Sequence, residues 1–193
     1  FVSGIRLRLV RIIATVGFLL MPLAWFVLKD YQKQRILVFM NPDIDPFGSG
    51  YHIIQSKIAI GSGTIFGKGL FNGTQSQLNF LPENHTDFIF SVIGEELGFI
   101  GCIFVLILLF MLIYRSIKVA YTCNDRFGML LATGIGSMFC FEVLVNAGMT
   151  MGIMPVTGIP LPFISYGVSA LTTNMISVGI LLNISMQRKK YIF

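Results

Sequence analysis

The stretch FIGCIFVLILLFMLIY, from Phe99 to Tyr114, decides the fold class of this chain. It contains no charged side chain and consists mainly of Leu, Ile and Phe. A helix needs about 20 predominantly apolar residues to cross a bilayer. Extended back to Phe88, the stretch therefore predicts a membrane-spanning helix over about residues 88–114.

The composition of the whole chain agrees with a membrane protein. Of the 193 residues, 54% are hydrophobic and only 12% are charged, and the mean hydropathy is +0.78. Soluble domains carry about 25% charged residues. This small number of charged residues cannot cover a surface that faces water. A single soluble globule is therefore excluded.

Three further apolar segments complete a predicted bundle of four spanning helices. They cover about residues 10–28, 127–147 and 170–186. The predicted fold class is an all-α polytopic membrane bundle. Between the first two spans lies a loop over residues 29–87, whose aromatic and aliphatic content favours an ordered segment, because loops of this length are usually functional or disordered.

The positions of the basic residues predict the orientation of the bundle. Nine of the 14 Lys and Arg residues fall before the first span, between the second and third, or after the fourth. Cytoplasmic loops carry an excess of Lys and Arg. Both termini are therefore expected in the cytoplasm and the loop 29–87 outside. The net charge of +5 reflects this topology, so no nucleic-acid partner is expected.

Asp87 is the first candidate functional residue. It ends the polar run PENHTD and directly precedes the apolar Phe88. Asp is favoured at a helix N-terminus as a cap or as a partner of the helix dipole. A carboxylate at the mouth of a membrane helix could equally serve in catalysis, and the residues alone leave both interpretations open.

Three more acids lie inside predicted spans, where an ionisable residue is by default a functional hypothesis. Glu95 and Glu96 are neighbours and point about 100° apart on a helix. Glu95 falls nearer the face of Asp87, so we expect it in the pocket and Glu96 as a structural partner of a neighbouring helix. Glu142, one turn before Asn146, is expected to form an interhelical hydrogen bond.

A glycine-rich string, GSGTIFGKG from Gly61 to Gly69, invites a comparison with phosphate-binding loops. The nucleotide P-loop needs Gly where Ser62 stands and Ser or Thr where Gly69 stands. A nucleotide site is therefore excluded. Backbone amides freed by glycines could still cradle another phosphate, with Lys68 beside them.

Two long segments resemble a known family. The first includes QRILVFMNPDIDPFGSGYHIIQSKIAIGSG and NHTDFIFSVIGEELGFIG within Gln34–Gly101, and the second is NAGMTMGIMPVTGIPLPFISYGVSAL, Asn146–Leu171. Both resemble the SEDS family (shape, elongation, division and sporulation), and its elongation members more than its division members. The family has ten spanning helices, and this chain resembles the last four. Because it also begins with Phe1, we expect a piece of a longer protein.

The resemblance implies a peptidoglycan glycosyltransferase of the bacterial cytoplasmic membrane, active in elongation and cell-shape maintenance. Such an enzyme polymerises lipid II and works with a class B penicillin-binding protein, a transpeptidase. It would also need the N-terminal helices of the family and contact membrane lipid. The family's essential Asp falls in the HTDF motif and so transfers onto Asp87, as the general base.

The leaving pyrophosphate needs positive charge, which Lys68, Lys57 or Arg35 could supply, with Lys68 expected first. A divalent cation such as Mg²⁺ or Mn²⁺ near Asp87 is the alternative. The expected substrate site also includes His85 and Glu83, which lie beside Asp87 in the motif, and Glu95.

Two other functions remain open from the sequence. A lipid II flippase could use Glu95, Glu96 and Glu142 along a polar path through the membrane. An inactive truncated relic would fit a chain with six helices fewer than the family. The concentration of polar residues in the predicted outer loops favours the polymerase over the flippase.

Overall fold

The computed structural model describes residues 7–45, 48–78, 80–81 and 83–187, and every regular element among them is a helix. The elements run in the order α1 (Leu7–Val27), α2 (Asp30–Met40), a 3-10 turn η1 (Pro42–Ile44), α3 (Ser49–Ser62), α4 (Thr74–Gln77), α5 (Ile89–Thr122), α6 (Arg126–Thr150) and α7 (Val168–Gln187). The predicted all-α class is thus confirmed.

Three helices of the described residues are long and apolar enough to cross a membrane: Ile89–Thr122, Arg126–Thr150 and Val168–Met186. They correspond to the second, third and fourth predicted spans. The first predicted span coincides with α1, whose passage through a membrane stays a prediction. The orientation of the bundle, with its termini in the cytoplasm, also stays a prediction.

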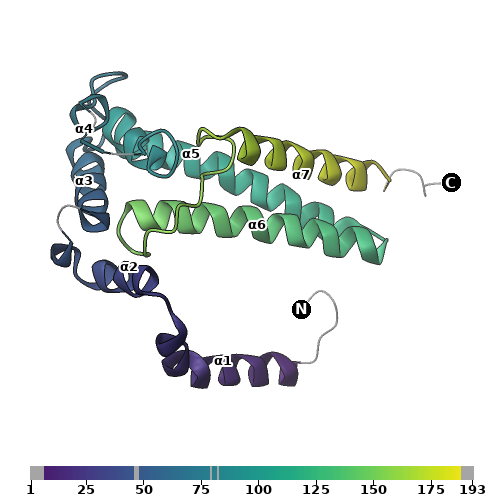
Figure 1. Ribbon diagram of the computed structural model, residues 1–193. Coiled ribbons are helices and arrows are strands. Elements are labelled where there is room, and N and C mark those ends of the chain that lie inside the picture. The colour runs from purple at the N-terminus through teal and green to yellow at the C-terminus, as the bar shows by residue number, and fades with distance from the viewer. Residues whose placement is uncertain (1–6, 46–47, 79, 82, 188–193) are drawn as a thin grey trace.

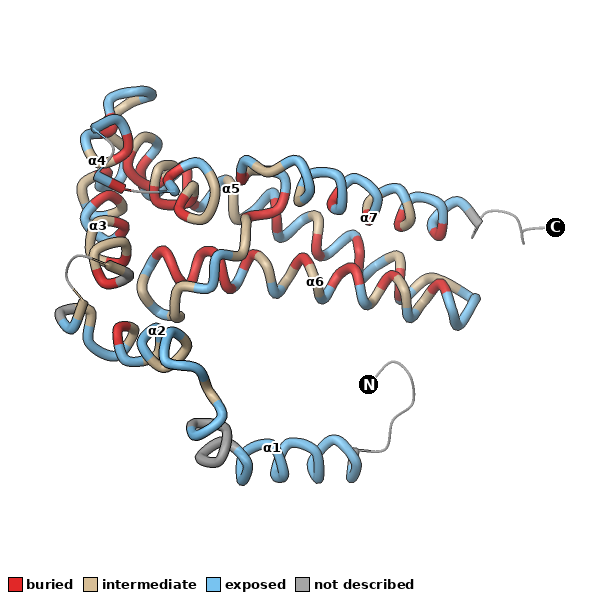
Figure 2. Tube along the Cα trace, viewed as in Figure 1, coloured by how far each residue is buried: buried red, intermediate tan, exposed pale blue. Residues whose placement is uncertain are grey.

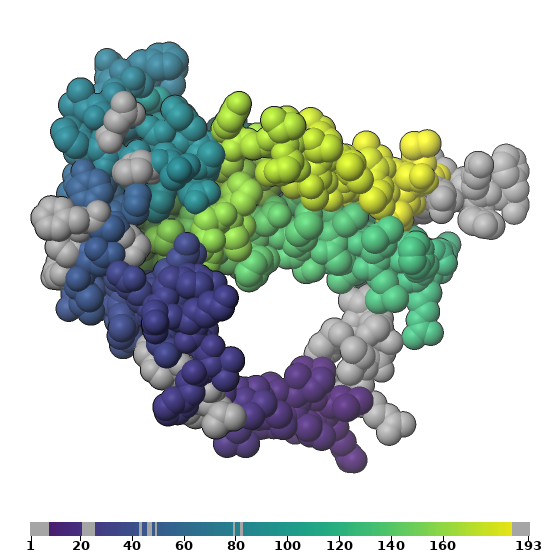
Figure 3. Space-filling model, in the orientation of Figure 1, coloured from purple at the N-terminus to yellow at the C-terminus, as the bar shows by residue number. Residues whose placement is uncertain are grey.

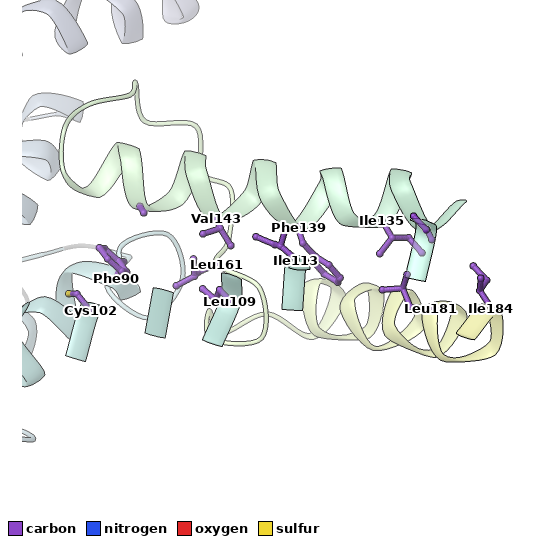
Figure 4. Close-up of a cluster of buried hydrophobic side chains, with 13 residues drawn as sticks. Phe90, Cys102, Leu109, Ile113, Ile135, Phe139, Val143, Leu161, Leu181 and Ile184 are labelled. Atoms are coloured by element: carbon purple, nitrogen blue, oxygen red, sulfur yellow. The ribbon is translucent and has the colours of Figure 1, made fainter. Parts of the chain in front are cut away.

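Helices α5, α6 and α7 lie side by side and form the main bundle (Figure 1). Their shared core is apolar throughout (Figure 4) and consists of Phe90, Cys102, Leu109, Ile113, Ala120, Ala132, Ile135, Phe139, Val143, Ala147, Leu161, Leu181 and Ile184. The opposite faces of these helices are exposed (Figure 2). They carry large apolar side chains, as expected of helices that meet lipid.

Helix α1 stands apart from the bundle, with open space between it and α6 (Figure 3). Residues 8–20 of α1 are all exposed. The segment predicted as one long loop, residues 29–87, is largely helical, since it contains α2, η1, α3 and α4. Helix α3 crosses the end of the bundle at which α5 begins (Figure 1) and packs against α5.

A buried hydrogen-bond cluster joins α3 to the bundle. The Ser56 hydroxyl of α3 lies 2.6 Å from the Ser91 hydroxyl of α5 and donates to the main-chain oxygen of Thr150 in α6, also at 2.6 Å. All three residues have no exposed surface. Because buried polar groups must be hydrogen-bonded, this cluster specifies how α3 sits on the bundle.

Helix α5 is broken at Gly98, which has φ 68° and ψ −164°. The break releases main-chain groups that an unbroken helix would pair internally, and the glycine-rich string supplies new partners. The released carbonyls of Glu95 and Glu96 accept from the amides of Lys68 and Gly69, both at 3.0 Å. The apolar pattern of residues 88–114 predicts a continuous helix here, and the break at Gly98 corrects that prediction.

The released amides are also satisfied by the string. Phe99 donates to the carbonyl of Thr64 at 3.0 Å, and Ile100 donates to that of Ile65 at 3.2 Å. A side chain at Gly98 would collide with the main chain of Gly67 and Ile65. The glycines are thus needed for close approach of two backbones. The amides of Lys68 and Gly69 are used inside the fold, so the phosphate cradle expected from them is wrong.

Candidate functional site

Asp87 lies at the start of α5, two residues before Ile89. The N-cap residue of α5 is Phe88, and its side chain makes no capping hydrogen bond. Asp87 therefore does not occupy the N-cap position, whereas its partnership with the helix dipole and a role in catalysis both stay predictions. The residue is partly exposed.

The main chain of the HTD motif is fixed by segments far along the sequence. Three successive carbonyls each accept one hydrogen bond from α6 or from the loop between α6 and α7. The amide of Tyr166 donates to His85 at 2.9 Å, the hydroxyl of Ser165 donates to Thr86 at 2.6 Å, and the side-chain amide of Asn146 donates to Asp87 at 2.9 Å. The two segments that carry the family resemblance thus meet at Asp87.

Asn146 also holds the loop that covers Asp87. It has no exposed surface, and its Nδ2 donates a second hydrogen bond to the carbonyl of Ile159 at 2.8 Å. The neighbouring Gly158 has φ +74°, and a Cβ placed on it would lie 3.2 Å from Oδ2 of Asp87. The carboxylate therefore lies directly against the main chain of Gly158.

The surroundings raise the pKa of Asp87 above its usual value of 3.8. Burial is the largest cause, because it disfavours the charged form. The negative charge of Glu83 raises the pKa further, and the positive charge of Arg35 lowers it. A carboxylate with a raised pKa is better matched to accepting a proton near neutral pH.

Two of the predicted cationic residues rest on the same loop that covers Asp87. Nη1 of Arg35, on α2, donates to the carbonyl of Val156 at 3.3 Å. Lys57, on α3, lies over Gly152, where a Cβ would collide with the end of its side chain. Both residues are exposed. The structure thus brings Arg35 and Lys57 to the loop that includes Gly158.

Lys68 and Glu95 are bound to each other. Nζ of Lys68 lies 2.9 Å from Oε1 of Glu95 and donates to the hydroxyl of Thr74 at 2.8 Å. The Glu95 carboxylate is fully buried and accepts from both α4 and Lys68. Its donors are Lys68, the hydroxyl of Thr74, the amide of Gln75, and both the amide and the hydroxyl of Ser76. This buried pair ties the loop around α4 to α5.

The remaining predicted residues take less central places. The Glu83 carboxylate accepts from the hydroxyl of Thr86 at 3.0 Å, and both Glu83 and His85 are exposed. Glu96 was expected to be the structural partner of a neighbouring helix. Among the described contacts, it binds Gly69 only through its main-chain carbonyl. Oε2 of Glu142 is buried and has no hydrogen-bond partner among the described residues, so the interhelical bond expected there is absent from this part of the chain.

No three His, Cys, Asp or Glu side chains in the described ranges come together as a metal site would require. We therefore derive no step through the divalent cation considered at Asp87. The contributions of Asn146, Gly158, Ser165 and Tyr166 were missed. All four belong to the second segment of resemblance, which marked the region but not the role of any one residue.

A family model described as "Cell cycle protein", which covers FtsW, RodA and SpoVE, matches residues 1–190. The chain belongs to the SEDS family. This SEDS chain is 48% identical over 190 residues to the peptidoglycan glycosyltransferase MrdB of Escherichia coli K12, a match that covers 98% of the chain and 51% of MrdB.

Two further relatives give the same picture. The peptidoglycan glycosyltransferase RodA of Treponema pallidum is 49% identical over 162 residues, which cover 84% of this chain and 37% of that protein. A probable peptidoglycan glycosyltransferase FtsW of Trichlorobacter lovleyi is 47% identical over 180 residues, or 92% of this chain and 47% of that protein. The SEDS chain spans about half the length of the curated relatives it matches, or less.

Solved structures support the fold. A structure described as "Structural coordination of polymerization and crosslinking by a peptidoglycan synthase complex" matches with a TM-score of 0.73 and 33% identity, over 95% of this chain and 50% of that one. A mutant of the rod shape determining protein RodA of Thermus thermophilus matches with a TM-score of 0.54 and 36% identity, over 65% of this chain and 39% of that one. The bundle described above is therefore a SEDS arrangement.

Proposed function

We propose that this SEDS chain carries the catalytic carboxylate of a peptidoglycan glycosyltransferase that polymerises lipid II during cell elongation and shape maintenance. The observation that carries the proposal is the placement of Asp87. Its main chain is held by Asn146, its carboxylate lies against Gly158, and its pKa is raised. The similarity to MrdB and RodA, both peptidoglycan glycosyltransferases, supports the reaction class.

Asp87 acts as the general base of the transfer. The 4-hydroxyl of the acceptor sugar attacks the anomeric carbon of the donor lipid II and loses its proton to the carboxylate. The bond between that carbon and the pyrophosphate breaks, and undecaprenyl pyrophosphate leaves with the electron pair. A positioned base of this kind contributes about 10²–10⁴-fold.

Arg35 and Lys57 stabilise the charge of the leaving pyrophosphate. Both are exposed cations that rest on the loop which also holds Gly158 against Asp87. Lys68, which the sequence analysis ranked first, instead neutralises the buried Glu95. Moving it to a substrate would leave a buried carboxylate without its cation, which is costly. We therefore assign Lys68 and Glu95 a structural role, and Glu83 and His85 places at the exposed edge of the site.

The same proposal places the site at the outer face of the bacterial cytoplasmic membrane. Helix α1 is the first of four spans, residues 29–87 lie outside, and both ends of the chain lie in the cytoplasm, as the distribution of basic residues favours. The partner is a class B penicillin-binding protein. This partner fits a matching structure whose description couples polymerization to crosslinking in one complex.

The test uses a chimaera in which residues 1–190 of this chain replace the half of E. coli MrdB that they match. Purified chimaera in liposomes with lipid II is expected to form glycan strands, with unaltered MrdB as the positive control. A chimaera that is inserted and folded but moves lipid II across the bilayer without forming strands would favour the flippase. One that does neither, beside active MrdB, would favour the relic.

A further inference from the structure

We infer that the apolar tip of the loop between α3 and α4, residues 65–71, inserts into the membrane leaflet nearest Asp87. Four large side chains of this tip are more than half exposed: Ile65 at 57%, Phe66 at 80%, Leu70 at 62% and Phe71 at 78%. Contiguous apolar surface of this kind marks an interaction site for protein or membrane. This inference does not depend on the proposed catalytic activity.

The break in α5 sets the depth of the tip. From Phe99 to Thr122 the second part of α5 extends for about 36 Å at 1.5 Å per residue. This is enough to cross a hydrocarbon core of about 30 Å without help from the first part. Gly98 then lies near the boundary between hydrocarbon and headgroups. The tip is tied to that level because Ile65 accepts from the amide of Ile100 at 3.2 Å.

Part of the main chain of the tip is already satisfied by protein, which lowers the cost of bringing it to lipid. Non-helical backbone at membrane depth must have its polar groups satisfied by protein or water. Within the tip, the amide of Gly67 donates to Gly63 at 2.7 Å, and the amides of Lys68 and Gly69 donate to the broken end of α5 at 3.0 Å. Its one charged side chain, Lys68, is neutralised by Glu95 at 2.9 Å.

Lipid is the occupant that best fits the surroundings of the tip. Directly below the break, α5 exposes Phe99 at 61%, Ile100 at 52% and Phe104 at 62%, so the apolar surface of the tip continues that of a spanning helix. In Figure 1 the loop before α4 lies at the end of the bundle where α5 begins and points sideways, across the direction of the spanning helices. A sideways projection at this level meets the leaflet, whereas an outward one would meet water.

The experiment measures the depth of a fluorescent label in a bilayer. The MrdB chimaera, with its native cysteines replaced, carries Phe66→Cys labelled with an environment-sensitive dye. It is reconstituted in liposomes of phosphatidylethanolamine and phosphatidylglycerol that contain lipids with a nitroxide high on the acyl chain. An interfacial segment buries its apolar face about 5–10 Å into the boundary, so we expect blue-shifted emission, loss of fluorescence with the nitroxide lipid and protection from aqueous iodide.

Two matched positions calibrate the result, and Leu70→Cys repeats it within the tip. Phe104→Cys, on the exposed face of α5, should behave as a lipid-facing site. Gln77→Cys, an exposed polar position in α4, should be quenched by iodide and not by the nitroxide lipid. Iodide quenching at Phe66 equal to that at Gln77 would place the tip in water and overturn the inference. Protection from both quenchers would show that protein covers the tip, which also overturns it.

Discussion

Asn146 donates its side-chain amide to the main-chain carbonyl of Asp87 at 2.9 Å, across 59 residues of sequence. The same nitrogen donates to Ile159 at 2.8 Å, so one buried side chain connects the helix that begins beside Asp87 to the loop that covers it. The position of the proposed base is thus set by a residue on a different helix.

Replacing Asn146 should disturb both the fold and the activity. Asn146→Ala leaves two carbonyls without their donor, and an unsatisfied buried polar group costs about 1–3 kcal/mol. We expect a lower melting temperature of the chimaera in detergent and slower polymerisation of lipid II. Ser137→Ala, on the exposed side of the same helix and bonded only to Gly134, is the control and should change neither quantity. Unchanged activity in Asn146→Ala would refute its positioning role.

Gly158 should be intolerant of any side chain. Gly158→Ala places a Cβ 3.2 Å from Oδ2 of Asp87 at a residue with φ +74°, so it both strains the backbone and moves the carboxylate. We expect turnover to fall by more than thermal stability can explain. The control is Gly179→Ala, because a Cβ at this helical position meets nothing within 4 Å. If both variants polymerise lipid II equally well, the close approach at Gly158 has no catalytic meaning.

The raised pKa of Asp87 predicts two pH effects. The base must be ionised, so polymerisation should decline as the pH falls through this raised value. The effect on stability has the opposite sign, because the folded state binds the proton of Asp87 more tightly than the unfolded state does. The stabilisation from this proton is complete below pH 3.8 and is lost as the pH rises through the raised pKa.

Asp87→Asn should therefore melt at a higher temperature than the unchanged protein at neutral pH, and the difference should shrink on acidification. Glu83→Gln removes a charge that raises the pKa of Asp87, so it should move the acid limb of the rate profile to lower pH. Melting curves and pH–rate profiles measure these effects. A limb that moves to higher pH in Glu83→Gln would contradict the electrostatic description of the site.

Variants of Lys68 and Arg35 should distinguish a cation with a structural role from one with a catalytic role. Lys68→Ala removes the cation that pairs with the buried Glu95 and should lower stability by about 1–3 kcal/mol, while the KM for lipid II stays the same. Arg35→Ala loses one exposed contact to Val156 and should lower kcat without a large change in melting temperature. The opposite pattern would mean that Lys68 stabilises the leaving pyrophosphate, as expected from the sequence.

The sequence predicted the helices better than the contacts between them. Apolar runs located α5, α6 and α7 because the length and composition of a spanning helix are local properties. The motif around Asp87 is also evident from the sequence alone. The break at Gly98 was missed because its stability depends on partners near Thr64 and Lys68, which come from another part of the chain.

Partnerships between distant side chains were equally invisible. Glu95 and Lys68 were each predicted to bind substrate, yet they bind each other across 27 residues. No pattern in the sequence indicated that the side chain of Asn146 would bind the main chain of Asp87. Such contacts follow from the packing of α3, α5 and α6, which hydrophobic periodicity does not determine.

The most direct test of the account compares the MrdB chimaera with its Asp87→Asn variant, which keeps the size of the side chain and removes the base. Both are purified, checked for folding by their melting curves, and supplied with lipid II in liposomes. The account predicts glycan strands from the unchanged chimaera, and a loss of at least about 10²-fold in rate from the variant. Strands formed at the unchanged rate by a folded Asp87→Asn protein would contradict it.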